Sequence, residues 1–265
     1  MATRRCARTA AKRPAPGRSR ATRYDEAVPK ESKRDLRDRA LKIAAILEDE
    51  YASATTALHH KSAFELLIAT ILAAQCTDAR VNLTTPALFK RWPDARAMAT
   101  ATQEEMEAAV KSCGTYRNKA RFVIATAKLL VERHGGEVPA KMEELTALQG
   151  VARKTSNVVL GSWFKTPAGV VVDTHCQRLS RRLALSRHDD PVKIERDQMD
   201  LLPRERWTSF AHQLVYHGRR ICAARSPKCG ACSLREMCPS RQDVTKPRRL
   251  PGKYDVAPKP RKRAK

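Results

Sequence analysis

The sequence predicts an all-α protein. Apolar residues recur at helical spacing in one segment after another, and some of these segments begin with a Ser, Thr or Asp suited to cap a helix. No segment alternates with period two for long enough to form a strand. Val170-Val171-Val172 is the only candidate, and it is too short to build a sheet. With 265 residues the chain is long enough to bury a core, in one or two lobes.

Three helices are expected in the first half of the folded region. Residues 37–51 carry apolar residues at helical spacing. Ser62, with Glu65 three residues later, predicts a capping-box start, and the dense apolar run that follows predicts a helix buried on most sides. Residues 102–111 begin with a Thr and two acids, which suits a helix N-terminus.

The second half of the folded region predicts further helices in close succession. A long amphipathic run, residues 118–134, stops at Gly135-Gly136. The others are expected at residues 142–148, 155–164, 174–185, 191–201 and 207–219. Three aromatic residues are expected in the core: Trp163, Phe164 and Trp207.

The charge balance predicts a polyanionic partner. Lys and Arg number 52 against 28 Asp and Glu, which gives a formal net charge of +24. Nucleic acid is the first candidate and an anionic membrane surface the second, although no long apolar span is present. Residues 1–33 and 241–265 read as disordered basic tails that add salt-dependent phosphate contacts or simply solubility. The start lacks the apolar region of a secretory signal, and a transit peptide is the alternative.

Four cysteines near the end of the chain predict a metal centre. Cys222, Cys229, Cys232 and Cys238 are separated by gaps of six, two and five residues, a density that suits a [4Fe–4S] cluster or a tetrahedral zinc. Two disulfides are the competing interpretation. Spacing alone does not separate iron–sulfur from zinc. The remaining cysteines, Cys6, Cys76, Cys113 and Cys176, are expected to be free thiols.

Residues 145–160 predict two short helices joined by a tight turn, Gln149 to Ala152, that resembles a helix–hairpin–helix motif. Such a turn presents backbone N–H groups to a phosphate oxygen. The usual turn is Leu-Pro-Gly-Val-Gly, so Gln149 and Ala152 depart from it. Ala152 would cost about 1–2 kcal/mol if its φ had to be positive. The expected phosphate contacts are Gly150, Val151, Ala152 and Arg153.

Lys154 and Asp173 are the candidate catalytic residues, although each alone has a simpler interpretation. Lys154 alone would be a phosphate contact, and Asp173, which follows Val170-Val171-Val172, would be a helix N-cap. In order, the chain reads G-x-x-R-K-T-x-N-V-V, then V-D-T-H, then the four cysteines. This order resembles the endonuclease III family of DNA glycosylases. Three further segments match it: A-A-Q-C-T-D, G-T-Y-R-N-K-A and H-G-R-R-I-C.

The resemblance covers about residues 37–238 and implies an architecture. Residues 56–165 would form a six-helix lobe with the hairpin. Residues 34–55 and 166–240 would form a lobe that carries a [4Fe–4S] cluster. The cleft between the lobes would have Lys154 on one wall and Asp173 on the other. The implied protein is a monomeric bacterial enzyme of the cytoplasm and nucleoid, and its partner is double-stranded DNA with damaged bases or abasic sites.

The resemblance also implies a bifunctional DNA glycosylase and AP lyase that removes oxidised pyrimidines. Lys154 would attack C1′ of the everted nucleotide and form a Schiff base, which requires an amine with a lowered pKa; we expect burial to supply it. Asp173 would help deprotonate Lys154 or stabilise positive charge on the sugar. Further DNA contacts are implied for Thr115, Tyr116 and Lys228, and for Gln75, which would fill the vacated space or contact the orphaned base. A helix-end hydrogen bond is the alternative role for Gln75.

Departures from the family pattern keep alternatives open. Thr115 is small and polar where the family commonly has Leu as a wedge, which predicts slower turnover. The protein could be mainly an AP lyase or a narrow-specificity glycosylase. It could also be an adenine-excising relative, which Lys154 disfavours, or a non-catalytic DNA-binding iron–sulfur protein. Zinc in place of iron would leave the purified protein colourless.

Overall fold

The computed structural model describes residues 31–241, and all regular secondary structure in this part of the chain is helical. This confirms the predicted fold class. The candidate strand at Val170-Val171-Val172 is an extended connector without strand pairing. Its ends, Val170 and Val172, are buried at 1% and 8% exposure, so its apolar character serves packing in a core and not a sheet.

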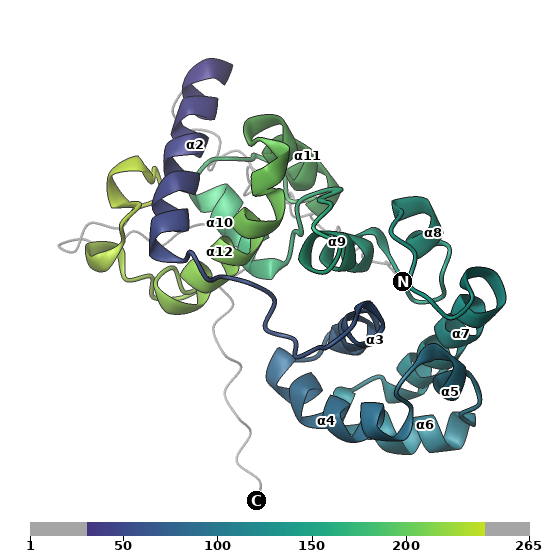
Figure 1. The fold of residues 1–265 in the computed structure, drawn as a ribbon. Helices are drawn as coiled ribbons and strands as arrows, with labels where there is room; N and C mark the ends of the chain where they lie inside the picture. Colours follow the sequence, from purple (N-terminus) through teal and green to yellow (C-terminus); the bar gives the residue numbers. More distant parts are fainter. Residues whose placement is uncertain (1–30, 242–265) are drawn as a thin grey trace, which may run out of the picture.

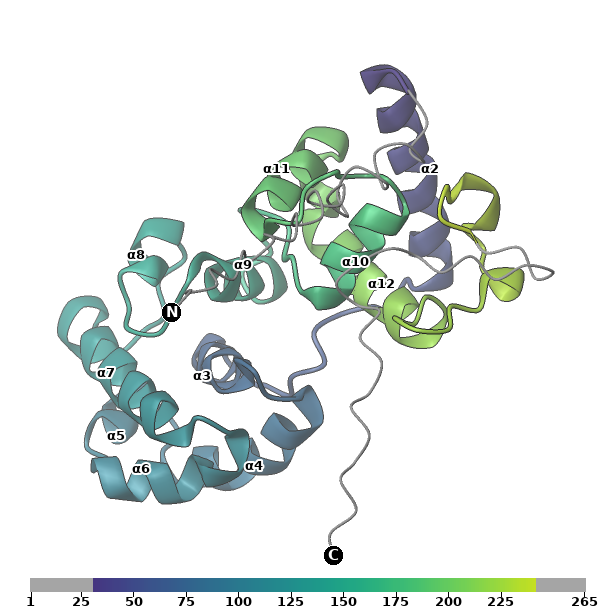
Figure 2. The same ribbon diagram turned by 180° about the vertical axis from the view of Figure 1, so that it is seen from behind.

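Seven helices surround one hydrophobic core, which we call the first core. Their apolar side chains come from residues 58–160 and include the almost fully buried face of α3. This lobe curves around α3, with α4 to α7 along its outer side in both ribbon views (Figures 1 and 2). The helices are α3 (Ala63–Ala73), α4 (Asp78–Arg91), α5 (Ala95–Ala99), α6 (Gln103–Val110), α7 (Tyr116–His134), α8 (Met142–Thr146) and α9 (Arg153–Ser162).

A second core joins the two ends of the described chain. Apolar residues of 40–51 pack there with residues from 170 onward. The first described helix therefore lies against the last long one, α12 (Figures 1 and 2). The helices are α2 (Lys33–Glu50), α10 (Thr174–Arg182), α11 (Pro191–Leu201) and α12 (Trp207–Arg220). The two hydrophobic cores agree with the two lobes that the family resemblance implies. The exact residue boundaries of these lobes stay a prediction.

The helix starts follow the caps read from the sequence, with two local differences. The Ser32 hydroxyl accepts a hydrogen bond from the Asp35 amide at 3.1 Å, so α2 begins at Lys33, four residues before the predicted start. Ser62 caps α3 by accepting from the Glu65 amide. The Glu65 carboxylate accepts from the Lys61 amide and not from Ser62, so this capping box is displaced by one residue.

Two helices, α4 and α5, were missed by the sequence interpretation. Pro86 lies inside α4 and weakens a helical pattern, because proline removes a backbone donor. The usable signals were the caps: Thr77 accepts from the Arg80 amide, and Asp94 accepts from the Ala97 amide. Both are residue types that favour helix N-termini.

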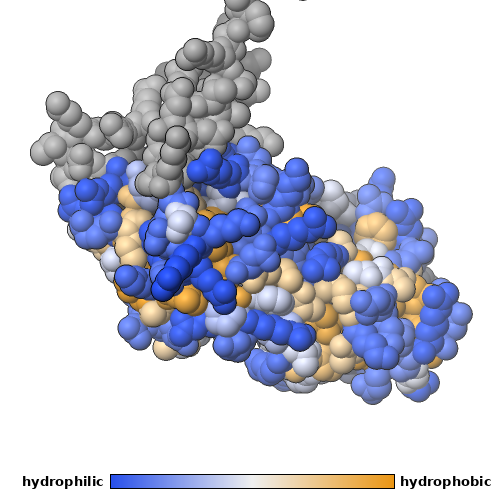
Figure 3. Space-filling view, turned by 90° about the horizontal axis from the view of Figure 1, so that it is seen from above, coloured by the Kyte–Doolittle hydropathy of each residue, from blue (hydrophilic) through white to orange (hydrophobic). Residues whose placement is uncertain are grey.

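The expectation that Trp163 lies in the core is wrong. It lies at the C-terminal end of α9, is 38% exposed and stacks edge-on against His60. Phe164 and Trp207 are partly buried against the first and second cores. Hydrophilic side chains dominate the face seen from above (Figure 3). None of the helices within residues 31–241 is long and apolar enough to cross a membrane. The predicted tails lie almost wholly outside the described residues.

Candidate active site

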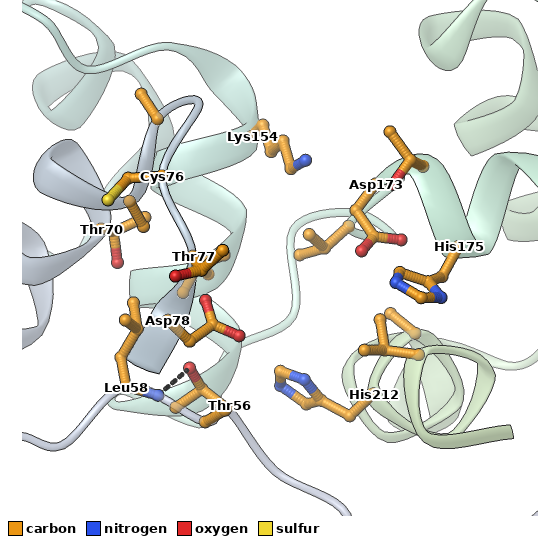
Figure 4. Close-up of a pocket in the computed structure, with 18 of the residues that line it drawn as sticks. Thr56, Leu58, Thr70, Cys76, Thr77, Asp78, Lys154, Asp173, His175 and His212 are labelled. Carbon is orange, nitrogen blue, oxygen red and sulfur yellow. Dashed lines mark hydrogen bonds between the residues drawn. The ribbon is translucent and has the colours of Figure 1, made fainter. Parts of the chain in front are cut away.

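A cleft of about 790 Å³ lies where the two cores meet, within the range of small-ligand sites. Its lining includes Thr70, residues 73–79 and part of α9 on one side, and parts of α10 and α12 on the other. The close-up shows Lys154 on one wall, with Asp173 facing it across the open space (Figure 4). The structure therefore brings together the two residues that the sequence interpretation paired as catalytic.

Lys154 is held at the opening turn of α9, directly after the hairpin. Its side chain points into the cleft, but the residue is exposed. The expectation that the protein itself buries this amine is therefore wrong. The cleft wall is open at this point, and only a molecule that fills the cleft would exclude water from Lys154.

Asp173 both caps a helix and faces the cleft. One carboxylate oxygen accepts a hydrogen bond from the Cys176 amide at 2.7 Å, which starts α10. The carboxylate lies on the opposite side of the cleft from Lys154 (Figure 4). Cys176, buried behind it, has its pKa raised to about 12, because burial and the charge of Asp173 oppose its ionisation. Asp173 therefore caps α10 and lines the cleft at the same time, while its catalytic role stays a prediction.

Two histidines lie beside Asp173 in the cleft. His212 exchanges a hydrogen bond with the Ser162 hydroxyl at 3.2 Å, and burial lowers its pKa to about 4, so its imidazole is neutral at neutral pH. Burial also lowers the pKa of His175, and its Nδ1 accepts from the Arg178 guanidinium at 3.1 Å. The structure gives both a cleft position.

The hairpin has the backbone that its sequence needs. Gly150 adopts φ +74°, and a Cβ built there would lie 2.7 Å from the Phe122 side chain. Ala152 adopts φ −93°, ψ 168°, so it does not incur the cost of a positive φ. The Thr126 hydroxyl donates to the Gln149 carbonyl at 2.5 Å and fixes the turn onto α7. The departure from the family pattern at Ala152 therefore leaves the hairpin unstrained at that position.

Replacing Gly150 by alanine is expected to destabilise the protein by about 2–4 kcal/mol, because the new methyl group meets both a positive φ and Phe122. Ala152→Gly is the matched control. It relieves no strain and is expected to change the free energy of unfolding by less than about 1 kcal/mol. Urea unfolding of the two variants measures the difference. Equal effects would show that the hairpin tolerates a side chain at position 150.

Arg153, which the sequence interpretation assigned to a DNA phosphate, is engaged inside the protein. Its guanidinium donates to the Glu195 carboxylate of α11 at 3.1 Å. Glu195 is 6% exposed and also accepts from the Asn157 amide at 2.9 Å. The same carboxylate lies so close to Gly169 that a Cβ there would be 1.9 Å from it. Arg153 therefore connects the hairpin helix to α11. Its assignment as a DNA contact stays a prediction.

The two loops assigned to strand opening both contain residues with positive φ. Gln75, exposed at the end of α3, has φ 53° and lines the cleft. Thr115 has φ 39° and follows Gly114, which has φ 62°. Tyr116 begins α7. A non-glycine residue in this region is uncommon and marks a position that the fold imposes.

An ion pair across the cleft was missed from the sequence. The Arg219 guanidinium of α12 donates to the Asp78 carboxylate of α4 at 2.7 Å, and both residues line the cleft. They are 141 positions apart, so no local pattern pairs them. The contact joins the two lobes beside the Lys154–Asp173 space.

The four C-terminal cysteines line one cavity with Lys228. In residues 31–241 no set of three or more His, Cys, Asp or Glu side chains is arranged as metal ligands. The donor chemistry nevertheless fits a cationic centre. Burial is the main cause that raises the pKa of Cys232 to about 11 and that of Cys238 to about 12, and the neighbouring thiols add to the effect. Clustered thiolates are therefore unfavourable without a cation.

Two cationic or donor groups adjoin these thiols. The Arg182 guanidinium, 8% exposed, lies 3.2 Å from the Cys222 sulfur and donates to the Ala223 and Ala224 carbonyls. His217 Nε2 lies 3.4 Å from the Cys232 sulfur. The other thiols agree with expectation: Cys113 and Cys176 are buried, Cys76 is half-buried, and all three are free. Cys6 lies outside the described residues.

Comparison with known proteins decides the family. The profile of the HhH-GPD superfamily of base excision DNA repair proteins matches residues 68–204. The endonuclease III of Synechocystis sp. is 51% identical over 206 residues, which cover 78% of this chain and 94% of that protein. The chain belongs to the endonuclease III family. The endonuclease III of Escherichia coli (strain K12) is 37% identical over 204 residues, which cover 77% of this chain and 96% of that protein.

Solved structures agree with this family assignment. A trapped endonuclease III–DNA covalent intermediate is 38% identical and superposes with a TM-score of 0.73, covering 77% of this chain and 96% of that one. A non-covalent endonuclease III–DNA complex gives the same TM-score and identity. A thermostable thymine-DNA glycosylase, 19% identical with a TM-score of 0.69, shares the fold.

Proposed function

We propose that this endonuclease III-family protein, a DNA glycosylase and AP lyase of base excision repair, acts through Lys154 and Asp173 on duplex DNA that contains oxidised pyrimidines. One observation carries the assignment of the residues: an amine and a carboxylate face each other across a cleft shared by two lobes. The relatives seen on DNA, one of them trapped covalently, support a covalent route.

The first step brings the damaged nucleotide out of the helix and into the cleft. Eversion costs a few kcal/mol of stacking and pairing, and damage to the base reduces this cost. The hairpin at Gly150 to Ala152 offers backbone N–H groups at the start of α9, which suits a phosphate near the everted nucleotide. The nucleotide then covers Lys154 and supplies the burial that the protein alone does not provide.

The chemical step follows from the placement of the amine. The neutral Lys154 amine attacks C1′ of the deoxyribose, the bond to the base breaks, and the base leaves with the electron pair. Loss of a proton and ring opening give a Schiff base between Lys154 and C1′. The iminium acidifies the C2′ protons, so β-elimination expels the 3′ phosphate and nicks the strand. Water then hydrolyses the imine and restores Lys154.

Asp173 acts opposite the amine. Its carboxylate accepts the proton that Lys154 loses, or stabilises the positive charge that develops on the sugar as the base departs. The hydrogen bond from the Cys176 amide holds the carboxylate in place. Neutral His212 beside it adds no competing positive charge.

Replacing Thr115 by leucine is expected to raise turnover on duplex substrate by about twofold to tenfold. A larger apolar wedge opens the strand better, and leucine is not β-branched at a position with φ 39°. Single-turnover excision from duplex DNA measures the gain. Thr146→Leu, at an exposed helix-end position away from the cleft, is the control. An unchanged rate and lesion profile would remove Thr115 from strand opening.

Cys222, Cys229, Cys232 and Cys238 would hold a [4Fe–4S] cluster, which would brace the C-terminal segment against α10 and α12 and present Lys228 to the DNA backbone. The purified protein is therefore expected to be yellow-brown with about four irons per chain. Cys232→Ala is expected to lose iron and colour, whereas Cys113→Ala keeps both. A colourless protein that contains one zinc would overturn the cluster assignment.

A substrate panel tests the function as a whole. Duplexes carrying an oxidised pyrimidine, a uracil mismatch, an adenine mismatch or an abasic site are incubated with the protein, with and without borohydride. Excision and trapping on the oxidised pyrimidine are the expected result. Cleavage of the abasic duplex alone would indicate a lyase, and binding without cleavage would indicate a non-catalytic DNA-binding protein.

A further inference from the structure

Lys119 is a buried cation that the proposed mechanism does not use. It lies on α7 and is 3% exposed. Burial lowers its pKa, and the groups that raise the pKa again are the thiols of Cys76 and Cys113, with no carboxylate among them. A buried ammonium without a carboxylate partner is costly to keep. A side chain that served only packing would be apolar here, so the charge itself has a role.

The ammonium of Lys119 fixes one of the two loops assigned to strand opening. Its Nζ donates to the Cys113 carbonyl at 2.5 Å. Directly after this carbonyl come Gly114 and Thr115, both with positive φ. The Thr115 side chain makes no capping bond to α7, so the loop gains no support from a cap. The bond from Lys119 therefore anchors a backbone conformation that threonine disfavours.

The charge of the same ammonium also acts on a residue of the other loop. Cys76 directly follows Gln75, which has φ 53°, and its half-buried side chain packs on the first core that contains Cys113. The Cys76 thiol interacts with both the Cys113 thiol and the Lys119 charge. Two loops that are about 40 residues apart in sequence therefore meet at one buried cation.

We propose that Lys119 is a positioning residue that fixes the Gln75 loop and the Thr115 loop relative to each other, so that both side chains enter the space left by the everted nucleotide. This inference rests on the proposed function, because it assigns a device for strand opening to the same site. Lys119 acts before the chemistry and does not touch the reacting atoms. Loss of Lys119 should therefore slow the reaction on duplex DNA, in which the damaged nucleotide must first leave the helix. It should not slow the reaction on single-stranded DNA, which needs no strand opening.

Lys119→Met removes the charge and the donor and keeps the length of the side chain. Lys128→Met, at an exposed position of the same helix, is the matched control. Excision from a duplex with an intact damaged base is expected to fall by about tenfold or more in Lys119→Met, while cleavage of a single-stranded abasic oligonucleotide stays within about twofold of wild type. Lys119→Arg, which keeps a cationic donor, is expected to recover part of the duplex activity.

A binding measurement separates this role from catalysis. 2-Aminopurine placed opposite a non-cleavable tetrahydrofuran site reports unstacking when the two loops enter the duplex. Its fluorescence is expected to rise with wild type and Lys128→Met and to rise little with Lys119→Met. Because no bond is cleaved, the result stands even if the wild-type protein lacks lyase activity, an outcome that would count against the proposed function and not against Lys119.

A second variant covers the case in which Lys119→Met does not fold. Gly114→Ala strains the loop through its φ of +62°, and the new Cβ meets no atom within 4 Å, so packing is unchanged. It is expected to reproduce the selective loss on duplex substrate. The proposal is overturned if a folded Lys119→Met loses duplex and single-strand cleavage equally or keeps full duplex activity. With Lys119→Met unfolded, wild-type behaviour of Gly114→Ala overturns it.

Discussion

Replacing Lys154 by alanine is expected to abolish the borohydride-trapped adduct with DNA and to lower base excision by about a thousandfold or more. The reason is that, within residues 31–241, Lys154 is the only lysine that lines the cleft. Because Lys154 is exposed at the start of α9, its replacement is expected to leave the fold intact. Denaturing gel electrophoresis of the trapped complex, with single-turnover excision in parallel, measures both effects.

Lys193→Ala is the control for this experiment. Lys193 is exposed in the first turn of another helix, α11, and lies outside the cleft. It is expected to give the wild-type yield of adduct. A normal adduct yield in Lys154→Ala would show that another amine is the nucleophile.

Replacing Asp173 by asparagine is expected to lower base excision by about a hundredfold to ten-thousandfold with little change in stability. Asparagine caps a helix about as well as aspartate, so the bond from the Cys176 amide is retained while the charge facing Lys154 is lost. The variant therefore separates the two roles that the structure gives to one carboxylate. Single-turnover kinetics and thermal unfolding are the paired measurements.

Asp190→Asn supplies a control with the same chemistry. Asp190 caps α11 by accepting from the Lys193 amide at 3.0 Å and is not part of the cleft. Both variants are expected to unfold within about 1 kcal/mol of wild type. Turnover near the wild-type level in Asp173→Asn would leave Asp173 with its capping role alone.

The elements with strong local signals were predictable. The pattern at residues 191–201 gave α11 with its observed bounds, and the box of Thr102 and Glu105 starts α6 as expected. A cap bond spans three residues, so sequence neighbours decide it. The missed α4 shows the converse. Pro86 is unfavourable in a helix by local rules, and packing of Val81 and Leu88 into the first core overrides it.

In the candidate site, too, some residues were predictable from the sequence and others were not. Lys154 and Asp173 were identified through a resemblance, carried by motifs that are contiguous in sequence. The ion pairs near these two residues were not identified from the sequence. Arg153 bonds to Glu195, 42 positions away, and Asp78 bonds to Arg219, 141 positions away. The burial of Lys119 was likewise set by packing within the first lobe, and the exposure of Lys154 by its place on the cleft wall.

By itself, the sequence determined the helical class, most helix starts and the clustered thiols, because periodicity, capping and spacing depend on residues that are close together in the chain. The order of short motifs identified the two catalytic candidates. Only the tertiary structure decided which charged groups meet, which amine faces open space and which loops share a buried cation. These features depend on distances between residues far apart in the chain. The Asp78–Arg219 contact arises where the two lobes meet, and the burial of Lys119 arises where helices of the first core pack together.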